Sequence, residues 1–239
     1  MKTIIRLFRW LLVSAVMFVI TGVEGKCALA FHGFPADTWY VSSKYTNPMT
    51  GRVSKNVLWK YMVIPSEDST VNVIVSDNLE KVAESATLIF DGDRRLVRAD
   101  KNQTIQAREV KQSVELSATQ PAVLDEFLVP GNWLNGQAPD AGETEYFIEK
   151  RKINRNVTFA RRLSLTTAAI DSATAVSAGM IDDSSKDLLD GSSLILVSCK
   201  ELPEKGDEKL LFRQLWSPRL SFWFYEKTPT RESWFVRDE

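Results

Sequence analysis

Residues 88–97 read LIFDGDRRLV and carry the strongest short-range strand–turn–strand signal in the chain. Three apolar residues run into the pair Asp91-Gly92, and the apolar pattern resumes at Leu96-Val97. An Asp-Gly pair between two apolar runs is a strong short-range signal for a β-hairpin. The sequence therefore predicts two antiparallel strands joined by a turn near Asp91.

Strand signals continue on both sides of this hairpin. Upstream, Val71, Val73 and Val75 alternate with other residues, as a strand with one buried face requires. Downstream, residues 146–153 and 157–167 are predicted to form a second hairpin. Four short apolar stretches bounded by proline, glycine or charged turns follow near the C-terminus: 194–199, 209–216, 222–226 and 232–236.

Helices are predicted to be few and short. One candidate runs from Asp77 to Ser85, and a second runs from a cap at Asp171 or Ser172 to Gly179. A third candidate starts at Pro121 and ends before Pro130. We therefore expect a mainly β (α+β) protein with two or three short helices. Its strands would form either one antiparallel, curved sheet or two small β-rich modules.

The composition changes between residues 131 and 142, where proline, glycine, asparagine and alanine dominate. Such a segment is typical of a long loop or linker. We expect it to separate an N-terminal β-rich half, residues 26–130, from a C-terminal β-rich half, residues 143–239. The alternative is that the two halves form one continuous domain.

Residues 1–25 are predicted to be an export signal. Lys2, Arg6 and Arg9 precede the uncharged apolar stretch 11–20, and a plausible cleavage point lies before Lys26. A bilayer-spanning helix needs roughly 20 apolar residues, which this stretch does not reach. We therefore expect a periplasmic or extracellular protein without a transmembrane span in the mature chain, and a retained anchor is the alternative.

The chain contains two cysteines, Cys27 and Cys199. In an oxidising compartment two cysteines more often pair than stay reduced, so the sequence predicts a disulfide between them. The alternative is that Cys199 is a small buried apolar residue.

Several chemistries have no support in the sequence. There are 30 basic and 31 acidic side chains and a single histidine, which argues against nucleic acid as a partner and against zinc sites. We find no nucleotide, dinucleotide or serine-hydrolase motif. We therefore expect no cofactor, no metal and no identifiable catalytic residue, although paired carboxylates of a glycan hydrolase are not visible in a sequence.

A cluster of cations marks the second predicted hairpin. It consists of Lys150, Arg151, Lys152, Arg155, Arg161 and Arg162. Arg161 interrupts an apolar row of its strand, so it needs a carboxylate, a sheet edge or an anionic ligand. Arg162 faces the opposite way. We take Lys150, Lys152 and Arg161 as candidate ligand-binding residues.

Aromatic residues crowd the C-terminus, where consecutive side chains must point to opposite faces of a strand. Both faces therefore need cover, from the core or from a partner. We take Trp223, Tyr225 and Trp234 as candidate partner-binding residues.

These observations favour a non-catalytic exported protein that binds an envelope protein, an anionic glycan or a lipid headgroup. One alternative is a carrier of a lipid or other apolar ligand in a curved-sheet cavity. A further alternative is a carboxylate-dependent glycan hydrolase.

Overall fold

The computed structural model describes residues 33–66, 69–77, 84–105, 108–116, 121–124, 129–153, 157–189, 194–217, 220 and 222–237. Within these ranges lie twelve strands: β1 (Thr38–Thr46), β2 (Val53–Pro65), β3 (Val71–Asp77), β4 (Glu84–Phe90), β5 (Leu96–Ile105), β6 (Arg108–Leu116), β7 (Thr144–Ile153), β8 (Val157–Ile170), β9 (Leu194–Glu201), β10 (Lys209–Trp216), β11 (Trp223–Thr228) and β12 (Arg231–Val236). Two short helices, α2 (Ser172–Ser177) and the 3₁₀ helix η1 (Asp183–Leu188), connect β8 to β9.

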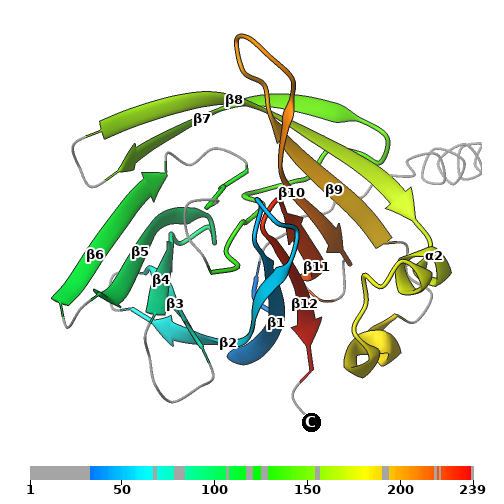
Figure 1. Cartoon of the computed structure of the whole chain (residues 1–239), viewed down its shortest axis with the longest axis horizontal. Coiled ribbons are helices and arrows are strands. Elements are labelled where there is room, and N and C mark those ends of the chain that lie inside the picture. Colours follow the sequence, from blue (N-terminus) through cyan, green and yellow to red (C-terminus); the bar gives the residue numbers. More distant parts are fainter. Residues whose placement is uncertain are drawn as a thin grey trace, which may run out of the picture.

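Each strand pairs antiparallel with the next strand along the chain, and β1 pairs with β12 to close a barrel (Figure 1). The prediction of a mainly β protein with a curved antiparallel sheet is therefore confirmed. Residues 26–130 and 143–239 contribute six of the described strands each, β1–β6 and β7–β12. Both sequence halves thus belong to one closed sheet.

The stretch LIFDGDRRLV forms the predicted hairpin between β4 and β5. Its turn is longer than a two-residue turn, because the N–H of Asp91 donates to the carbonyl of Arg95 and three residues lie between them. The last of the three, Arg94, takes the left-handed conformation at a φ of 61°. The carboxylate of Asp91 accepts hydrogen bonds from the backbone N–H groups of Asp93 and Arg95, at 3.0 and 2.9 Å. Asp91 therefore stabilises the turn through its side chain.

The second helix candidate is confirmed as α2. Asp171 caps its N-terminus by accepting the N–H of Thr174 at 2.8 Å, and Gly179 ends it with a φ of 68°. The candidate over residues 77–85 lies largely outside the described residues.

The third helix candidate was wrong at its start. Residues 121–124 are not helical, and Ala122 instead forms an isolated antiparallel bridge with Trp133. Proline at a first helical turn permits a helix but does not require one, and here the backbone pairs with a neighbouring segment.

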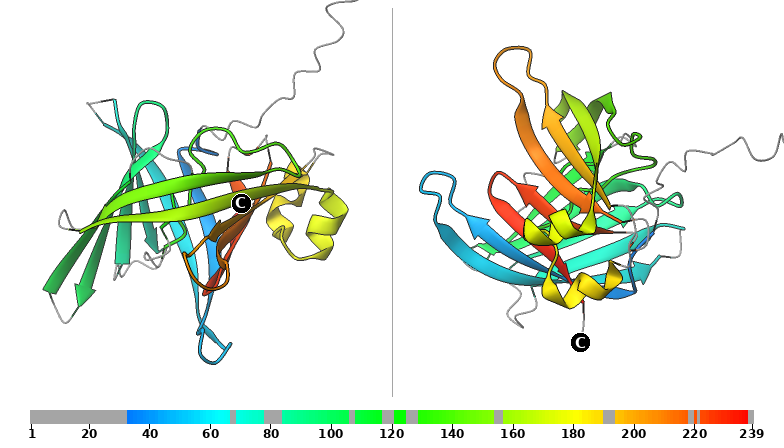
Figure 2. Two further views of the ribbon diagram at one scale, coloured as in Figure 1. Left: turned by 90° about the horizontal axis from the view of Figure 1, so that it is seen from above. Right: turned by 90° about the vertical axis from the view of Figure 1, so that its right-hand side faces the viewer.

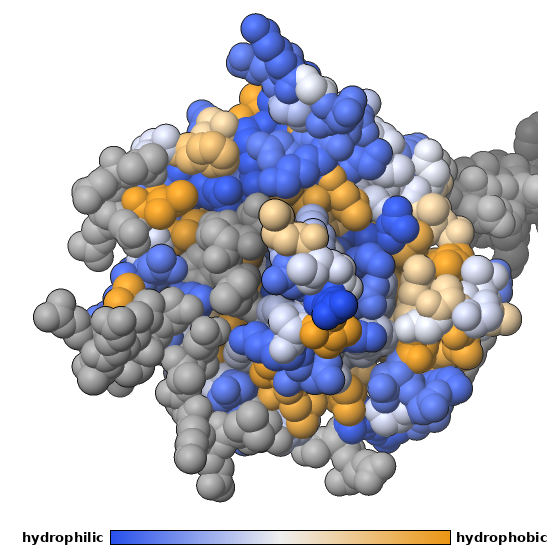
Figure 3. Space-filling view, in the orientation of Figure 1, coloured by the Kyte–Doolittle hydropathy of each residue, from blue (hydrophilic) through white to orange (hydrophobic). Residues whose placement is uncertain are grey.

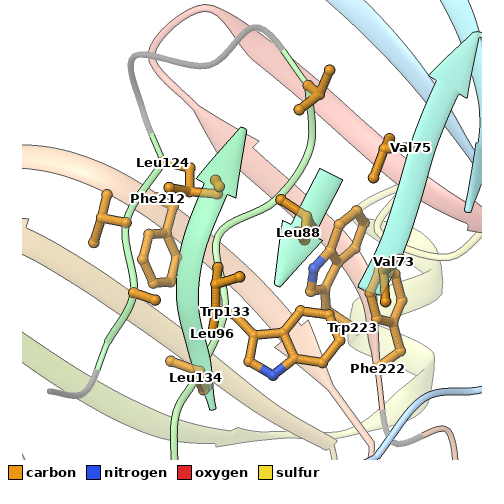
Figure 4. Close-up of a cluster of buried hydrophobic side chains, with 14 of the residues drawn as sticks. Val73, Val75, Leu88, Leu96, Leu124, Trp133, Leu134, Phe212, Phe222 and Trp223 are labelled. Atoms are coloured by element: carbon orange, nitrogen blue, oxygen red, sulfur yellow. The ribbon is translucent and has the colours of Figure 1, made fainter. Parts of the chain in front are cut away.

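The connection between β6 and β7 enters the barrel. We call residues 121–124 and 129–139 the inner segment; nearly all of them are buried. The close-up in Figure 4 shows Leu124, Trp133 and Leu134 of the inner segment among side chains of the surrounding strands, such as Leu88 and Phe212. The diameter of a β-barrel increases with the number of strands. In an eight-stranded barrel the inward side chains can fill the interior, whereas twelve strands enclose a larger space. Here the inner segment helps to fill that space.

Side chains of the wall bind the backbone of the inner segment. The Tyr61 hydroxyl donates to the carbonyl of Pro130, and Gln214 donates to the carbonyl of Asn132 at 3.0 Å. Within the inner segment, the side-chain oxygen of Asn132 accepts the N–H of Leu124 at 2.7 Å. These bonds supply partners for polar backbone groups that have left water.

The export and disulfide predictions concern residues that are only partly described. Residues 1–25 and Cys27 lie outside the described residues, and Cys199 is buried in the core on β9. The disulfide therefore stays a prediction. None of the described helices has the length and apolar character needed to cross a membrane.

Candidate functional site

The candidate aromatic residues of the C-terminal strands are largely covered by the protein itself. Trp223 is 1% exposed and stacks on Phe222, with ring centroids 4.5 Å apart, inside the barrel. Tyr225 and Trp234 pack against each other at 5.8 Å, on the opposite face of the sheet from the barrel interior. On that face the segment containing α2 covers them, and Ala175 and Ile181 join the same apolar cluster.

Trp234 is also engaged through its polar atom. Its indole N–H donates to the carbonyl of Gly179 at 2.7 Å, which ties β12 to the end of α2. Burial, and also the neighbouring carboxylate of Glu232, raises the pKa of the Tyr225 phenol above its ordinary value. Among Trp223, Tyr225 and Trp234, only Trp234 keeps part of its surface accessible.

Arg161 meets a carboxylate. Its guanidinium Nε lies 2.5 Å from Oε2 of Glu149 on the facing strand β7, and both side chains are buried. The other carboxylate oxygen of Glu149 accepts the N–H of Val123 in the inner segment at 3.2 Å. The buried charge of Arg161 is therefore balanced within the protein, as such a charge requires.

A second buried ion pair joins β11 and β12. Glu226 is paired with Arg231 and accepts a hydrogen bond from Gln214 at 2.7 Å. Burial is the largest single effect and lowers the pKa of Arg231, but Glu226 together with Tyr45 and Tyr61 raises the pKa overall. Nearby, burial raises the pKa of Tyr61 well above its ordinary value of 10.0. Of these groups, Gln214 and Tyr61 bond the backbone of the inner segment.

Lys150 and Lys152 are exposed on the outer face of the β7–β8 ribbon, which we define as residues 144–153 and 157–170. Tyr146 and Ile148 occupy the two preceding outward positions of β7 and are 70% and 58% exposed. In β8, Arg162 is exposed on the same face, directly opposite Ile148. We call these five residues the outer cluster: Tyr146, Ile148, Lys150, Lys152 and Arg162.

The outer cluster combines apolar surface with positive charge. No acidic side chain occupies the positions that share its face, which are 146, 148, 150 and 152 in β7 and 158, 160, 162 and 164 in β8. The nearest acidic neighbour in register is Glu115 of β6, which faces Lys152. Exposed cations beside apolar side chains suit a ligand that carries negative charge and apolar groups.

A surface cleft of about 320 Å³ lies beside the outer cluster. One wall is the end of the ribbon, including Ile148, Phe159 and Arg162, and the other wall is residues 201–204 after β9. Figure 2 shows the ribbon crossing one side of the barrel, with the β9–β10 hairpin projecting next to it. In the orientation of Figure 1, hydrophilic residues predominate around that hairpin (Figure 3).

Sequence reasoning identified Lys150 and Lys152 but did not assign a role to Tyr146, Ile148 and Phe159. Their signal was available, because Tyr146, Ile148, Lys150 and Lys152 follow one another with the period of two that places them on one face. Which face points outward depends on the barrel interior, which the local pattern does not reveal.

Across the described ranges, no group of three or more His, Cys, Asp or Glu side chains is arranged to hold a metal ion. The two buried carboxylates described above, Glu149 and Glu226, each pair with an arginine.

Comparison with known proteins adds no assignment: no family model matches the chain, and no curated protein or solved structure is detectably similar to it.

Proposed function

We propose that this chain is an exported, non-catalytic protein that binds an anionic partner through the outer cluster of the β7–β8 ribbon. The partner would be an envelope protein, an anionic glycan or a lipid headgroup. Export rests on the charged and apolar pattern of residues 1–25. The binding role rests on one observation, the exposed face that joins Lys150, Lys152 and Arg162 to Tyr146 and Ile148.

This face suits binding for two physical reasons. Tyr146 and Ile148 expose apolar area that gains free energy when a partner removes it from water. The three cations raise the local concentration of anions and orient an approaching partner, an effect that salt screens over about 8 Å at physiological ionic strength.

A carrier function has less support than surface binding. A carrier in a curved sheet needs interior space for its ligand. The interior of this barrel contains the inner segment and large side chains, among them Trp133, Phe222 and Trp223.

The test is a charge reversal with a matched control. The variant Lys150→Glu/Lys152→Glu/Arg162→Glu reverses the outer cluster, and Lys44→Glu/Arg52→Glu/Lys55→Glu makes the same change in net charge at the β1–β2 hairpin. Binding would be measured with three polyanionic probes: polyglutamate, heparin and phosphatidylglycerol vesicles. Melting curves would verify that both variants fold.

We expect the wild type to bind at least one probe and the outer-cluster variant to lose about tenfold or more in affinity, equivalent to about 1.4 kcal/mol. The control variant should retain most of the affinity. Equal losses in both variants would mean that net charge alone drives binding, and the proposal would then fail.

A further inference from the structure

Strand β8 is longer than the strand that covers it on one side. Its residues 163–170 pair with β9, whereas its residues 157–166 pair with β7. In the part of the chain that the structure describes, no strand pairs with residues 158–162 on the side away from β7. We call these five residues the open edge.

The direction of the backbone groups at the open edge follows from one hydrogen bond. The N–H of Leu202 donates to the carbonyl of Arg162 at 2.9 Å, so the backbone groups of Arg162 point away from β7. Backbone groups of residues two apart in a strand point to the same side. Ala160 and Thr158 therefore direct their N–H and C=O groups away from β7 as well.

The cover of the open edge ends at a proline. β9 ends at Glu201, and Pro203 directly follows Leu202, whose N–H makes the last backbone hydrogen bond to β8 in the described part of this segment. Thr158, Phe159 and Ala160 are all exposed. Phe159 and Ala160 line one side of the cleft of about 320 Å³, and residues 201–204 line the other. A strand with unpaired backbone groups beside a cleft is a template for adding a further strand.

We propose that the open edge of β8 binds an extended acidic segment of a partner protein, which adds to the barrel as an antiparallel strand. This inference rests on the proposed function and narrows its partner to a protein. It also predicts the side-chain pattern of the bound segment.

Charges on the outer face select acidic side chains there. Lys150 lies directly opposite Ala160 and Lys152 opposite Thr158, while Arg162 belongs to the edge itself. An added strand lies about 4.8 Å beyond β8, so its outward side chains come within reach of these long cations.

The inner side of the edge selects apolar side chains. Phe159 presents its ring on that side, 38% exposed, with the guanidinium of Arg151 5.0 Å from its centroid. Glu201 and Glu204 line the opposite wall of the cleft and disfavour further acidic groups there. A segment that alternates acidic and apolar residues satisfies both faces.

The probe is a seven-residue peptide with Glu at alternate positions and Val or Thr between them, titrated into the purified protein and followed by calorimetry. A matched peptide carries N-methyl groups on the backbone nitrogens that face β8. The protein variant is Ala160→Pro, which removes the edge N–H where proline is tolerated in a sheet, and Ala160→Ser is its control. Circular dichroism and melting curves establish that both variants fold.

We expect the peptide to bind the wild type and Ala160→Ser, and to bind Ala160→Pro about tenfold more weakly. The N-methylated peptide should lose affinity for the wild type to a similar extent. If Ala160→Pro misfolds, the N-methylated peptide still tests the edge on the wild type alone.

Two results would overturn the inference. If the peptide and its N-methylated form bind equally well, the partner binds the face and not the edge, while the proposed function stands. If sedimentation shows a wild-type dimer that Ala160→Pro abolishes, the edge pairs with a second copy of the chain. Loss of binding in the control charge reversal at the β1–β2 hairpin would instead count against the proposed function.

Discussion

Glu149 and Arg161 face each other across the β7–β8 ribbon with Oε2 and Nε 2.5 Å apart, and their side chains are 1% and 4% exposed. This buried pair lies on the inner side of the same ribbon whose outer side carries Lys150 and Arg162. The alternation of β-strand side chains thus divides one basic stretch into a structural part and an accessible part.

We expect Arg161→Leu to destabilise the protein by about 3–5 kcal/mol, because it leaves the carboxylate of Glu149 buried without its partner charge. The double variant Glu149→Gln/Arg161→Leu should recover at least half of the loss, since glutamine still accepts from Val123. Urea unfolding measures both values.

The exposed pair Lys200–Glu208 provides a comparison for this experiment. Lys200→Ala should change stability by less than about 1 kcal/mol, because exposed ion pairs contribute little. A small effect of Arg161→Leu, similar to that of Lys200→Ala, would show that the Glu149–Arg161 pair does not support the ribbon.

Tyr61→Phe should alter stability in two ways. At neutral pH it removes the hydrogen bond to the carbonyl of Pro130 and should cost about 1–3 kcal/mol. Above pH 10 the difference in stability between the wild type and Tyr61→Phe changes, because the pKa of Tyr61 is raised in the folded protein. A group whose pKa is raised by folding contributes its full stabilisation at pH values below its pKa in the unfolded chain. This contribution decreases as the pH rises above that pKa.

The wild type should therefore lose stability above pH 10 more steeply than Tyr61→Phe. Urea midpoints measured across the alkaline range test this difference in slope. Parallel curves for the two proteins would contradict a buried, protonated Tyr61.

Gly131→Ala should destabilise the barrel, by about 1 kcal/mol or more. A β-carbon at this position would lie 3.2 Å from Cδ1 of Leu124 and 3.6 Å from a methyl group of Leu88. Gly92→Ala is the control, because its β-carbon would meet only the carbonyl of Ser69 at 3.9 Å. Thermal unfolding compares the two, and an equal or smaller effect of Gly131→Ala would argue against close packing of the inner segment.

Asp171 should make the end of α2 sensitive to acid. Hydrogen bonds from the side chain and backbone N–H of Thr174 lower the pKa of its carboxyl below the ordinary value of 3.8. A carboxyl whose pKa is lowered by folding contributes stability at pH values above its pKa in the unfolded chain. That contribution disappears as the pH falls through its pKa in the folded protein. Asp171→Asn keeps a capping oxygen but should remove this pH dependence.

The Thr174 amide resonance reports the state of this cap. It should shift in the wild type as pH falls below 3.8 and stay nearly constant in Asp171→Asn. The same shift in both proteins would assign the titration to another group.

Much of the sheet could be predicted from local pattern. The bounds of β10 match the predicted stretch 209–216, and β7, β8, β9 and β12 begin within about three residues of theirs. β1, β2 and β6 were missed. In β1 the inward position 43 is a serine, whose hydroxyl bonds that of Ser233 at 2.8 Å, so the apolar alternation is interrupted.

The path of the inner segment could not be predicted, because its composition is that of an exposed loop. Polar side chains make its burial tolerable. The side chain of Asn135 accepts the N–H of Leu96 at 2.9 Å and donates to its carbonyl, in place of water. Closure of the barrel through β1 and β12 likewise depends on residues far apart in sequence, such as Val41 and Phe235.

Only part of the candidate site could be predicted from the sequence. Charge identified Lys150 and Lys152, and strand alternation predicted that Arg161 and Arg162 face opposite ways. The sequence did not show that Arg161 is buried against Glu149. The surplus of C-terminal aromatics was visible, whereas their cover by α2 and the barrel interior is a tertiary property.

If the protein binds through the outside of the β7–β8 ribbon, a bound ligand should protect that ribbon from hydrogen exchange. Hydrogen exchange of the purified protein with and without polyglutamate, read by mass spectrometry, locates the contact directly. We expect the ligand to slow exchange in residues 144–170 and to leave β11, β12 and the inner segment unchanged. Slower exchange confined to β11, β12 or the inner segment would place the contact elsewhere and rule out the β7–β8 ribbon as the binding surface.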